Sequence, residues 1–580
     1  MTKFKEFLSK RKHQILQSTL VAFILPFILF VSLPMEIFSN NLDEFNFALN
    51  DFIWSSLLLV FLFTLLFFVI LFVLPNKANK IVCFCLLSLE FMLFLQGTYL
   101  NAGANSLGGD NMGKVLPVFS IVLNSILWVG IIATFVVLAC LKDKKGIIKI
   151  GSMIVVAILI MTQLVTLVTA STKENVFSSK YERMQAIDEN YESKNLTNYQ
   201  LASVSNQDNI FYFVVDRFDE DYAIDAYNRK PEIFDALDGF TWFQDYISLY
   251  GHTFPAVTSM LTDKKIDLET QKRVDYFETA YSGDTPLSEL QNNGYDINLY
   301  TQEYYAFNGN ELPDFVNNFN TGKFLVKDHF KLSFSMAAVA VARCVPLAFK
   351  NMTGANVNSN TCNYACRFVG DNNELNYVVD NKDVYNFLKG RVFENRSNKL
   401  FSFIHIEGCH STNYDADFKN LGIFDKKDMI YSVENSFKII KIFIDALKSA
   451  NMYESATIII TGDHSAPHND FSAANQPRQT ALFVKPADSA DSALEISNAQ
   501  VAQKDLWPTI FKDKSISSSV VSGESVFEIS ESTDRTREFI WQTYEGSRTQ
   551  EFTYQIVGSG ADFENYSLID TKTYDHFVME

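Results

Sequence analysis

The first 172 residues of this chain contain few charged residues. Through Thr172 there are 12 Lys/Arg and 8 Asp/Glu residues, a net charge of +4, so the total of -18 leaves -22 for the remainder. Five apolar runs fill this region, and they lack the polar face that a helix of a soluble core should show. The runs lie at about 14–33, 51–75, 79–100, 114–141 and 148–170. Each is near or above the roughly 20 residues that cross a bilayer, so we predict five transmembrane helices.

Basic residues are scarce in alternate loops between these runs, which carry Asp43, Glu44 and Asp110 instead. They gather before the first run, between the second and third, and between the fourth and fifth: Lys3, Lys5, Lys10, Arg11, Lys12, Lys77, Lys80, Lys142, Lys144, Lys145 and Lys149. This asymmetry predicts a cytoplasmic N-terminus. An odd number of spans then places everything after about residue 172 outside the cytoplasmic membrane. We expect no cleaved signal peptide, because the first run is too long and four more follow it.

Cysteine is also scarce, with seven residues in the chain. Three lie in the apolar runs, and the other four lie in the outer part: Cys344, Cys362, Cys366 and Cys409. Four thiols in an oxidising compartment permit two disulfides. The C-x3-C pair at 362 and 366 has no second pair nearby, which disfavours a zinc site. We therefore expect disulfides or free thiols.

The outer part has no internal repeat and no low-complexity segment. Residues 173–208 are polar and predict a juxtamembrane linker after the transmembrane domain of residues 1–172. Over 209–525, short apolar strands such as NIFYFVV (209–215), KLFSFIHI (399–406) and ATIIITGDH (456–464) alternate with helical patterns such as 432–449. This alternation predicts an α/β domain, a largely parallel sheet covered by helices on both faces. Residues 526–580 alternate in the manner of a small antiparallel C-terminal subdomain.

Polar side chains follow three of the predicted strands. Asp216 follows the first, Glu407 and His410 follow the second, and Asp463 and His464 follow the third. Ligands of parallel sheets bind beyond the carboxyl ends of the strands. Two carboxylates and an imidazole can hold a divalent cation such as zinc or manganese with one position open. A hydroxyl bound in that position would have a lowered pKa and become a nucleophile.

The ordered set of motifs resembles the alkaline phosphatase and sulfatase superfamily. The motifs are the strand that ends in Asp216, the segment TFPAVTSMLTD (253–263), the strand that ends in GDH (462–464), and DLWPTIF (505–511). With five apolar runs in front, the chain resembles the membrane branch, which contains the lipoteichoic acid synthases and the phosphoethanolamine transferases. The resemblance covers roughly residues 209–525 and implies a sulfatase-like α/β/α catalytic domain.

The resemblance places the nucleophile at Thr253, with Pro255 and the pair Leu261-Thr262 in register. Asp263 stands where the family usually has glycine, a departure that bears on the turn. Threonine cannot give the formylglycine aldehyde that sulfatases need, so sulfate ester hydrolysis is disfavoured. A threonine alkoxide suits attack on phosphorus, forming a phosphothreonine that a second hydroxyl or water resolves. Pro255 favours a helix start just after Thr253, where backbone N–H groups and the helix dipole stabilise phosphate oxygens.

The resemblance also implies one catalytic metal ion, manganese or zinc. Its ligands would be Asp216, Thr253, Asp463 and His464. The first ligand in the membrane transferases is usually Glu, so Asp216 is shorter by one methylene.

The histidines of the outer part are the remaining candidates for contact with a substrate. The segment FIHIEGCHSTNY (403–414) resembles the one that carries a histidine facing the substrate phosphate, and this predicts His410 as phosphate contact or general acid, with His405 behind it. His252 and His468 are open between a substrate contact and a structural role, and His468 could instead reach a second metal.

These features together predict an enzyme, a membrane-anchored metal-dependent phosphotransferase at the outer face of the cytoplasmic membrane. The donor would be a phospholipid whose headgroup phosphate is attacked by Thr253, and the acceptor a hydroxyl of an envelope glycan or lipid-linked glycan. Glycerol phosphate is favoured over phosphoethanolamine, because the histidine that the phosphoethanolamine transferases carry further downstream is missing. The alternatives are a phosphoethanolamine transferase, a phosphodiesterase that uses water, and a catalytically silent lipid-binding regulator. No nucleic-acid partner is expected.

Overall fold

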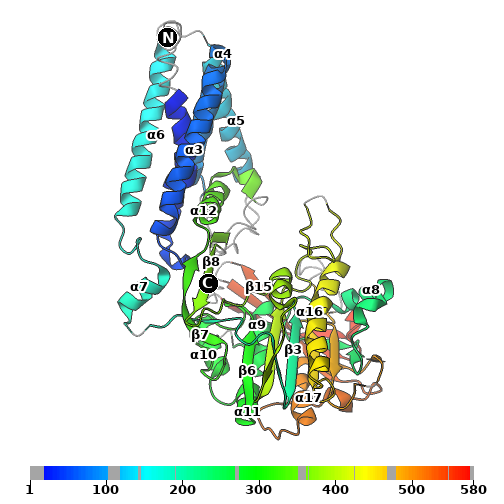
Figure 1. Cartoon of the computed structure of the whole chain (residues 1–580). Coiled ribbons are helices and arrows are strands. Elements are labelled where there is room, and N and C mark those ends of the chain that lie inside the picture. Colours follow the sequence, from blue (N-terminus) through cyan, green and yellow to red (C-terminus); the bar gives the residue numbers. More distant parts are fainter. Residues whose placement is uncertain are drawn as a thin grey trace. The chain divides into compact units, whose positions relative to one another are not determined.

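The chain forms two compact units in the computed structural model (Figure 1). The first contains Met1–Glu192 and Lys323–Phe368, and the second contains Ser193–Gly322 and Val369–Glu580, so the chain passes between the units three times. The structure describes residues 18–101, 118–141, 146–189, 191–267, 273–350, 361–362, 365–422, 425–466, 478–490, 492–545 and 548–574. The predicted boundaries after residues 172, 208 and 525 stay predictions.

The described part of the first unit has five helices that are long and apolar enough to cross a membrane, as the sequence predicts. They span Ser18–Asn40, which includes η1 (Ile28–Ser32) and α2 (Leu33–Asn40), then α3 (Asn50–Val73), α4 (Asn76–Tyr99), α5 (Val118–Cys140) and α6 (Ile147–Ser171). Figure 1 shows α3 to α6 as long rods. Large apolar side chains point outward from them, among them Trp54 and Phe61, which are 71% and 64% exposed. A surface of this kind is suited to lipid and supports membrane anchoring.

An excursion from the outer part of the chain belongs to this first unit. It leaves through β7 (Phe319–Val326), continues as α12 (His329–Cys344) and η4 (Leu347–Phe349), and returns through β8 (Cys366–Gly370). The helix α12 packs against η1, α2, α3 and α4. The sequence gives no signal for this excursion, because residues 329–344 are too few to span a bilayer. The short helix α7 (Lys180–Ile187) follows the five long helices.

The second unit is built on a seven-stranded sheet with the order β13-β4-β12-β11-β3-β10-β6. The central strands β6 (Tyr295–Tyr300), β10 (Lys399–Ile406), β3 (Asn209–Val215) and β11 (Thr457–Thr461) are parallel, as predicted. Beyond them β12 (Leu482–Lys485) pairs antiparallel with β11 and with β4 (Thr241–Phe243), and β13 (Glu495–Ser497) pairs parallel with β4.

Both faces of this sheet are covered, because β3 is buried along its whole length. Phe211 and Phe213 pack into a core with α16, and Ile210 and Tyr212 pack into a second core with α9 and α17. The helices are α8 (Glu220–Arg229), α9 (Thr253–Thr262), α10 (Arg273–Tyr281), α11 (Pro286–Asn292), α15 (Asn381–Leu388), α16 (Met429–Ser449) and α17 (Leu506–Asp513). The apolar face predicted near 432–449 is the buried face of α16. The α/β fold class is therefore confirmed.

The C-terminal strands form a separate three-stranded antiparallel sheet, as the alternating sequence predicts. The strands are β15 (Thr536–Glu545), β16 (Arg548–Val557) and β17 (Tyr566–Tyr574). This sheet joins the rest of the unit where Ile540 bridges Tyr250. The small strands are β1 (Lys194–Leu196), β2 (Ser203–Ser205), β5 (Tyr246–Ile247), β9 (Glu394–Arg396) and β14 (Val501–Ala502). All seven cysteines are free thiols, so neither of the two permitted disulfides forms.

Candidate metal centre

Three predicted ligands meet at the carboxyl ends of two neighbouring strands. Asp216 follows β3, and Asp463 and His464 follow β11. The two strands are parallel and in direct register, so their ends lie at one edge of the sheet. Nε2 of His464 lies 3.8 Å from Oδ1 of Asp216 and 3.7 Å from Oδ2 of Asp463, and one ligand atom from each residue lies within 4.8 Å of the others.

The burial of these side chains makes the group fit a cation. Asp216, Asp463 and His464 are 3%, 0% and 6% exposed. Oδ1 of Asp216 and Oδ2 of Asp463 have no hydrogen-bond partner among the described residues. Two buried carboxylates with unpartnered oxygens are costly unless a positive charge faces them. Oxygen and imidazole donors in this number suit a divalent metal ion.

The backbone around the ligands fixes their orientation. Oδ1 of Asp463 accepts hydrogen bonds from the N–H groups of Arg217 (2.8 Å) and His464 (2.9 Å). Arg217 adopts a left-handed φ of 58°, which is uncommon for a residue with a side chain. Gly462 leaves no room for a side chain, because a Cβ there would lie 2.7 Å from Cγ2 of Thr480 and 2.9 Å from the backbone nitrogen of Phe218. The GDH motif therefore needs its glycine for close packing.

The imidazole of His464 is held in one tautomer. Its Nδ1 lies 2.7 Å from the carbonyl oxygen of Ser465. A carbonyl can only accept, so Nδ1 donates this hydrogen bond, and whenever the ring is neutral Nε2 presents its lone pair to the ligand group.

The predicted nucleophile Thr253 lies beside this lone pair. It is the first residue of α9, and its Oγ1 lies 3.4 Å from Nε2 of His464. Phe254 has φ -96° and ψ 126°, so the helical turns begin at Pro255, just after Thr253, as predicted. The start of a helix favours an anion because its first N–H groups are unpaired within the helix. At the other end of α9, Asp263 takes a left-handed φ of 57°, which explains why glycine suits that position.

His405 lies close to one predicted ligand, whereas His410 lies in the loop that follows the same strand. His405 is fully buried in β10, where its Nδ1 lies 3.0 Å from Oγ1 of Thr301 and its Nε2 lies 3.7 Å from Oδ2 of Asp216. His410 is exposed in the loop after β10. Burial alone would raise the pKa of Asp216, but His405, and then the charges of His464 and His410, outweigh burial and hold that pKa below its usual value.

Glu407 heads the same loop. Its Oε1 accepts hydrogen bonds from Oγ of Ser411 (2.6 Å) and Nδ2 of Asn413 (3.0 Å). Burial raises the pKa of Glu407 to about 7; Ser411 opposes this rise and Asp380 adds to it. Glu407 is therefore partly protonated near neutral pH.

His252 is packed against the indole of Trp541, which no motif of the sequence marks. Its ring lies 4.6 Å from that of Trp541 in β15 and 6.4 Å from that of His464, measured between centroids. Burial lowers the pKa of His252 to about 3, helped by the nearby positive charges of His464 and Arg478, so this imidazole is neutral at physiological pH. Gly251 makes the close approach of Trp541 feasible, because a Cβ there would lie 2.4 Å from Cε3 of the indole. His468 lies outside the described residues.

Arg478 contacts the same indole. It is 3% exposed, its guanidinium carbon lies 4.9 Å from the centroid of Trp541, and its Nη1 donates to the carbonyl oxygen of Ala466 at 3.2 Å. Nη2 has no hydrogen-bond partner among the described residues. No sequence signal marked Arg478 or Trp541, because they come from segments that are distant in the chain and belong to no motif.

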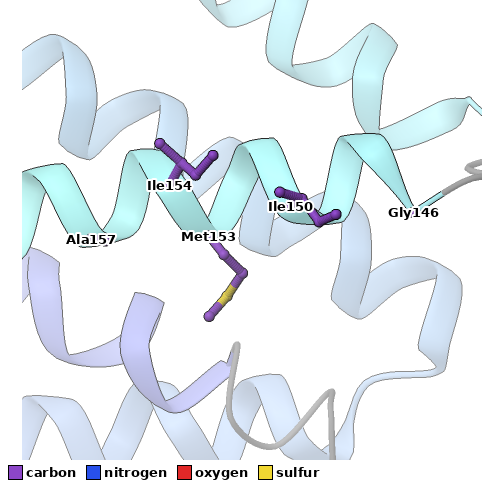
Figure 2. A pocket seen from close by; sticks show the side chains of 5 residues that line it. All are labelled: Gly146, Ile150, Met153, Ile154 and Ala157. Carbon is purple, nitrogen blue, oxygen red and sulfur yellow. The ribbon is translucent and has the colours of Figure 1, made fainter.

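The first unit contains an apolar pocket, unlike the polar candidate metal centre of the second unit. It has a volume of about 490 Å³ and is lined along α6 by Gly146, Ile150, Met153, Ile154 and Ala157 (Figure 2). These side chains offer no charged or hydrogen-bonding group, so the pocket is not a centre for chemistry.

No protein-family model matches the chain, and no curated protein matches it. The solved structures to which it is similar include a putative sulfatase, a protein of the alkaline phosphatase superfamily and a lipoteichoic acid synthase, the classes that its motifs resemble.

Three of these structures illustrate the level of similarity. The lipoteichoic acid synthase LtaP from Listeria monocytogenes is 12% identical, with a TM-score of 0.35 over 68% of this chain and 91% of that one. The phosphonate monoester hydrolase SpPMH from Silicibacter pomeroyi is 14% identical, with a TM-score of 0.36 over 64% and 89%. The alkaline phosphatase superfamily protein from Vibrio parahaemolyticus is 11% identical, with a TM-score of 0.33 over 66% and 85%. At these scores the similarities decide neither chemistry nor substrate, which must come from the side chains themselves.

Proposed function

We propose that this chain is a membrane-anchored, metal-dependent phosphotransferase that uses Thr253 as its nucleophile. The observation that carries the proposal is the placement of Oγ1 of Thr253 3.4 Å from Nε2 of His464, which faces two buried carboxylates that each have one oxygen without a hydrogen-bond partner among the described residues. A divalent metal ion bound there, manganese or zinc, would lower the pKa of the threonine hydroxyl. The ligands would be Asp216, Thr253, Asp463 and His464.

The transfer would proceed in two displacements at phosphorus. In the first, the Thr253 hydroxyl gives its proton to water, Oγ1 of Thr253 forms a bond to the headgroup phosphorus of a phospholipid, and the bond to the diacylglycerol oxygen breaks. His410, which is exposed in the loop after β10, supplies the proton that the leaving oxygen takes up. In the second, a hydroxyl of an envelope glycan or lipid-linked glycan attacks the phosphothreonine and gives its proton to His410, while the bond from phosphorus to Oγ1 breaks and Thr253 takes up a proton from water.

Glycerol phosphate is the favoured headgroup. Beyond residue 464 the sequence has only His468 and His576, so the downstream histidine that the phosphoethanolamine transferases carry is missing.

The predicted location is the cytoplasmic membrane with the second unit outside. The basic residues between the helices support this orientation. Within the first unit, Nζ of Lys80 at the start of α4 donates to the carbonyl oxygen of Leu141 at the end of α5, which puts the predicted cytoplasmic ends together. The excursion contacts the opposite ends: Arg343 lies 3.5 Å from Glu36, and the side chain of Asn101 donates to the carbonyl oxygen of Arg343.

Mass spectrometry of the full-length protein tests the proposal. The purified chain is incubated with manganese or zinc and phosphatidylglycerol without acceptor, next to Thr253→Ala and to a reaction with phosphatidylethanolamine. We expect a glycerol phosphate adduct on the peptide that contains Thr253, and none in the alanine variant. Release of free headgroup with a transient adduct would make the protein a phosphodiesterase. Absence of both adduct and release with every metal and lipid would overturn the enzyme proposal in favour of a silent lipid-binding regulator.

A further inference from the structure

The helix α12 is apolar on the side that the first unit leaves exposed. Phe330, Phe334 and Val341 are 45%, 48% and 37% exposed, and their spacing puts them on one face. No charged residue occurs between Lys331 and Arg343. A surface helix of a soluble protein would be polar on this face, whereas a helix that is apolar all round is buried in a core or in lipid.

The opposite face of α12 is fixed to the bundle of long helices by polar contacts. Oγ of Ser333 lies 2.7 Å from Oγ of Ser55 and 3.0 Å from Oγ of Ser56, and it donates to the carbonyl oxygen of Phe52. Leu332, Met336 and Ala340 are buried in the same apolar core as the long helices. The helix is therefore a part of the first unit, and its exposed stripe faces away from the bundle.

The exposed stripe is continuous with the apolar surface of the spans. The ring of Phe334 lies 5.5 Å from that of Phe30, which stacks at 5.3 Å on Phe63 of α3. At 16 residues α12 is about 24 Å long, too short to cross the hydrocarbon core. Its first turn and the residue before its N-cap carry exposed Lys331 and Lys327, cations suited to lipid phosphates.

We propose that α12 is embedded in the leaflet at the end of the bundle where α6 ends, with Phe330, Phe334 and Val341 against acyl chains and Lys327 and Lys331 at headgroup phosphates. The partner of this surface is a phospholipid bilayer. The chain is then attached to the membrane by an element inserted between two strands, β7 and β8, in addition to its five long helices. This inference depends on membrane anchoring and not on the transfer chemistry.

Photocrosslinking of the full chain tests this surface. p-Benzoylphenylalanine is placed singly at Phe330, Phe334 or Val341 in protein reconstituted into phosphatidylglycerol and phosphatidylethanolamine vesicles. Phe61 of α3 serves as the membrane control, and Val392, which is 91% exposed in the second unit, as the solvent control. We expect lipid adducts at the three α12 positions in yields close to that at Phe61. No lipid adduct should form at Val392.

Each other outcome overturns the inference in a distinguishable way. Lipid adducts at Phe61 but not on α12 would show that the long helices are in the membrane and that α12 is not. A crosslink from α12 to a second protein copy would make the stripe a dimer interface. Absence of a lipid adduct at Phe61 would contradict the membrane anchoring itself. As a second measurement, the double variant Phe330→Glu, Phe334→Glu should lose the rise in Tm that vesicles give over detergent, whereas the matched Phe330→Leu, Phe334→Leu variant should keep it.

Discussion

Oγ1 of Thr253 lies 3.4 Å from Nε2 of His464, the ring nitrogen that faces the carboxylates of Asp216 and Asp463. The two residues come from different segments, the start of α9 and the end of β11. Their contact depends on the packing of α9 and β11 into one apolar core, which contains Val257 and Met260 of α9 and Ile459 of β11. The fold thus holds the proposed nucleophile and the proposed metal ligand next to each other.

The variant Asp216→Asn should lower both the stability of the metal-free protein and its response to metal. His405 and the neighbouring charges hold the pKa of Asp216 below its usual value, so the ionised carboxylate stabilises the fold at neutral pH and its removal should lower Tm. The wild type should gain about 2.7 kcal/mol at a metal concentration of about 100 times Kd, and the variant should lose this gain. Calorimetric melting with and without manganese or zinc checks both effects. Asp216→Glu, which keeps the charge, should retain the gain. An equal metal-induced shift in Asp216→Asn would exclude Asp216 as a ligand.

Substitution of the nucleophile should separate chemistry from metal binding. Thr253→Ala should lower kcat by on the order of 10³-fold or more, because no hydroxyl remains to form the covalent intermediate. Thr253→Ser should retain part of the activity. Both variants should still bind the metal, since two carboxylates and an imidazole remain. Transfer from labelled phosphatidylglycerol measures kcat, and calorimetric titration measures metal affinity. Transfer at the wild-type rate by Thr253→Ala would contradict the covalent mechanism.

The variant Asp263→Gly should stabilise the protein most above neutral pH. Glycine relieves a left-handed φ of 57°, a gain of about 1 kcal/mol at any pH. In addition, burial raises the pKa of Asp263 to about 6. A raised folded-state pKa means that the wild type loses stability as pH rises from its ordinary value of 3.8 through 6. Tm measured at pH 5 and pH 8 should show a larger gain at pH 8. Asp263→Asn is the control that removes the charge and keeps the backbone strain, so its gain should be confined to the higher pH.

His252 should make the protein sensitive to acid. Burial lowers its pKa from 6.5 to about 3. Between pH 6.5 and about pH 3 the imidazole is therefore protonated in the unfolded chain but neutral in the folded chain. Stability should fall with decreasing pH over this window, by on the order of 1 kcal/mol per pH unit. Trp541→Leu admits water to the ring and should move the pKa of His252 back toward 6.5, as followed by NMR titration of its imidazole. An unchanged His252 pKa in this variant would show that Trp541 does not control its burial.

Much of the candidate site could be predicted from the sequence because its residues sit in short local motifs. Asp216 follows an unbroken apolar strand, GDH follows another, and Pro255 sets the start of α9. Two contacts could not be predicted in this way. One joins His405 to Asp216, and the other joins Arg478 to the ring of Trp541. These contacts join strands and loops that lie far apart in the chain, and no periodicity records them.

The sequence by itself determined the five apolar helices, the parallel strands and the antiparallel C-terminal sheet, because hydrophobic length and period depend only on local order. Only the tertiary structure decided that α12 leaves the outer part of the chain and packs in the first unit, and that β15 brings Trp541 against His252. The physical reason is the same in both cases. An apolar face must be buried, but which surface buries it depends on side-chain packing between segments that are distant in sequence.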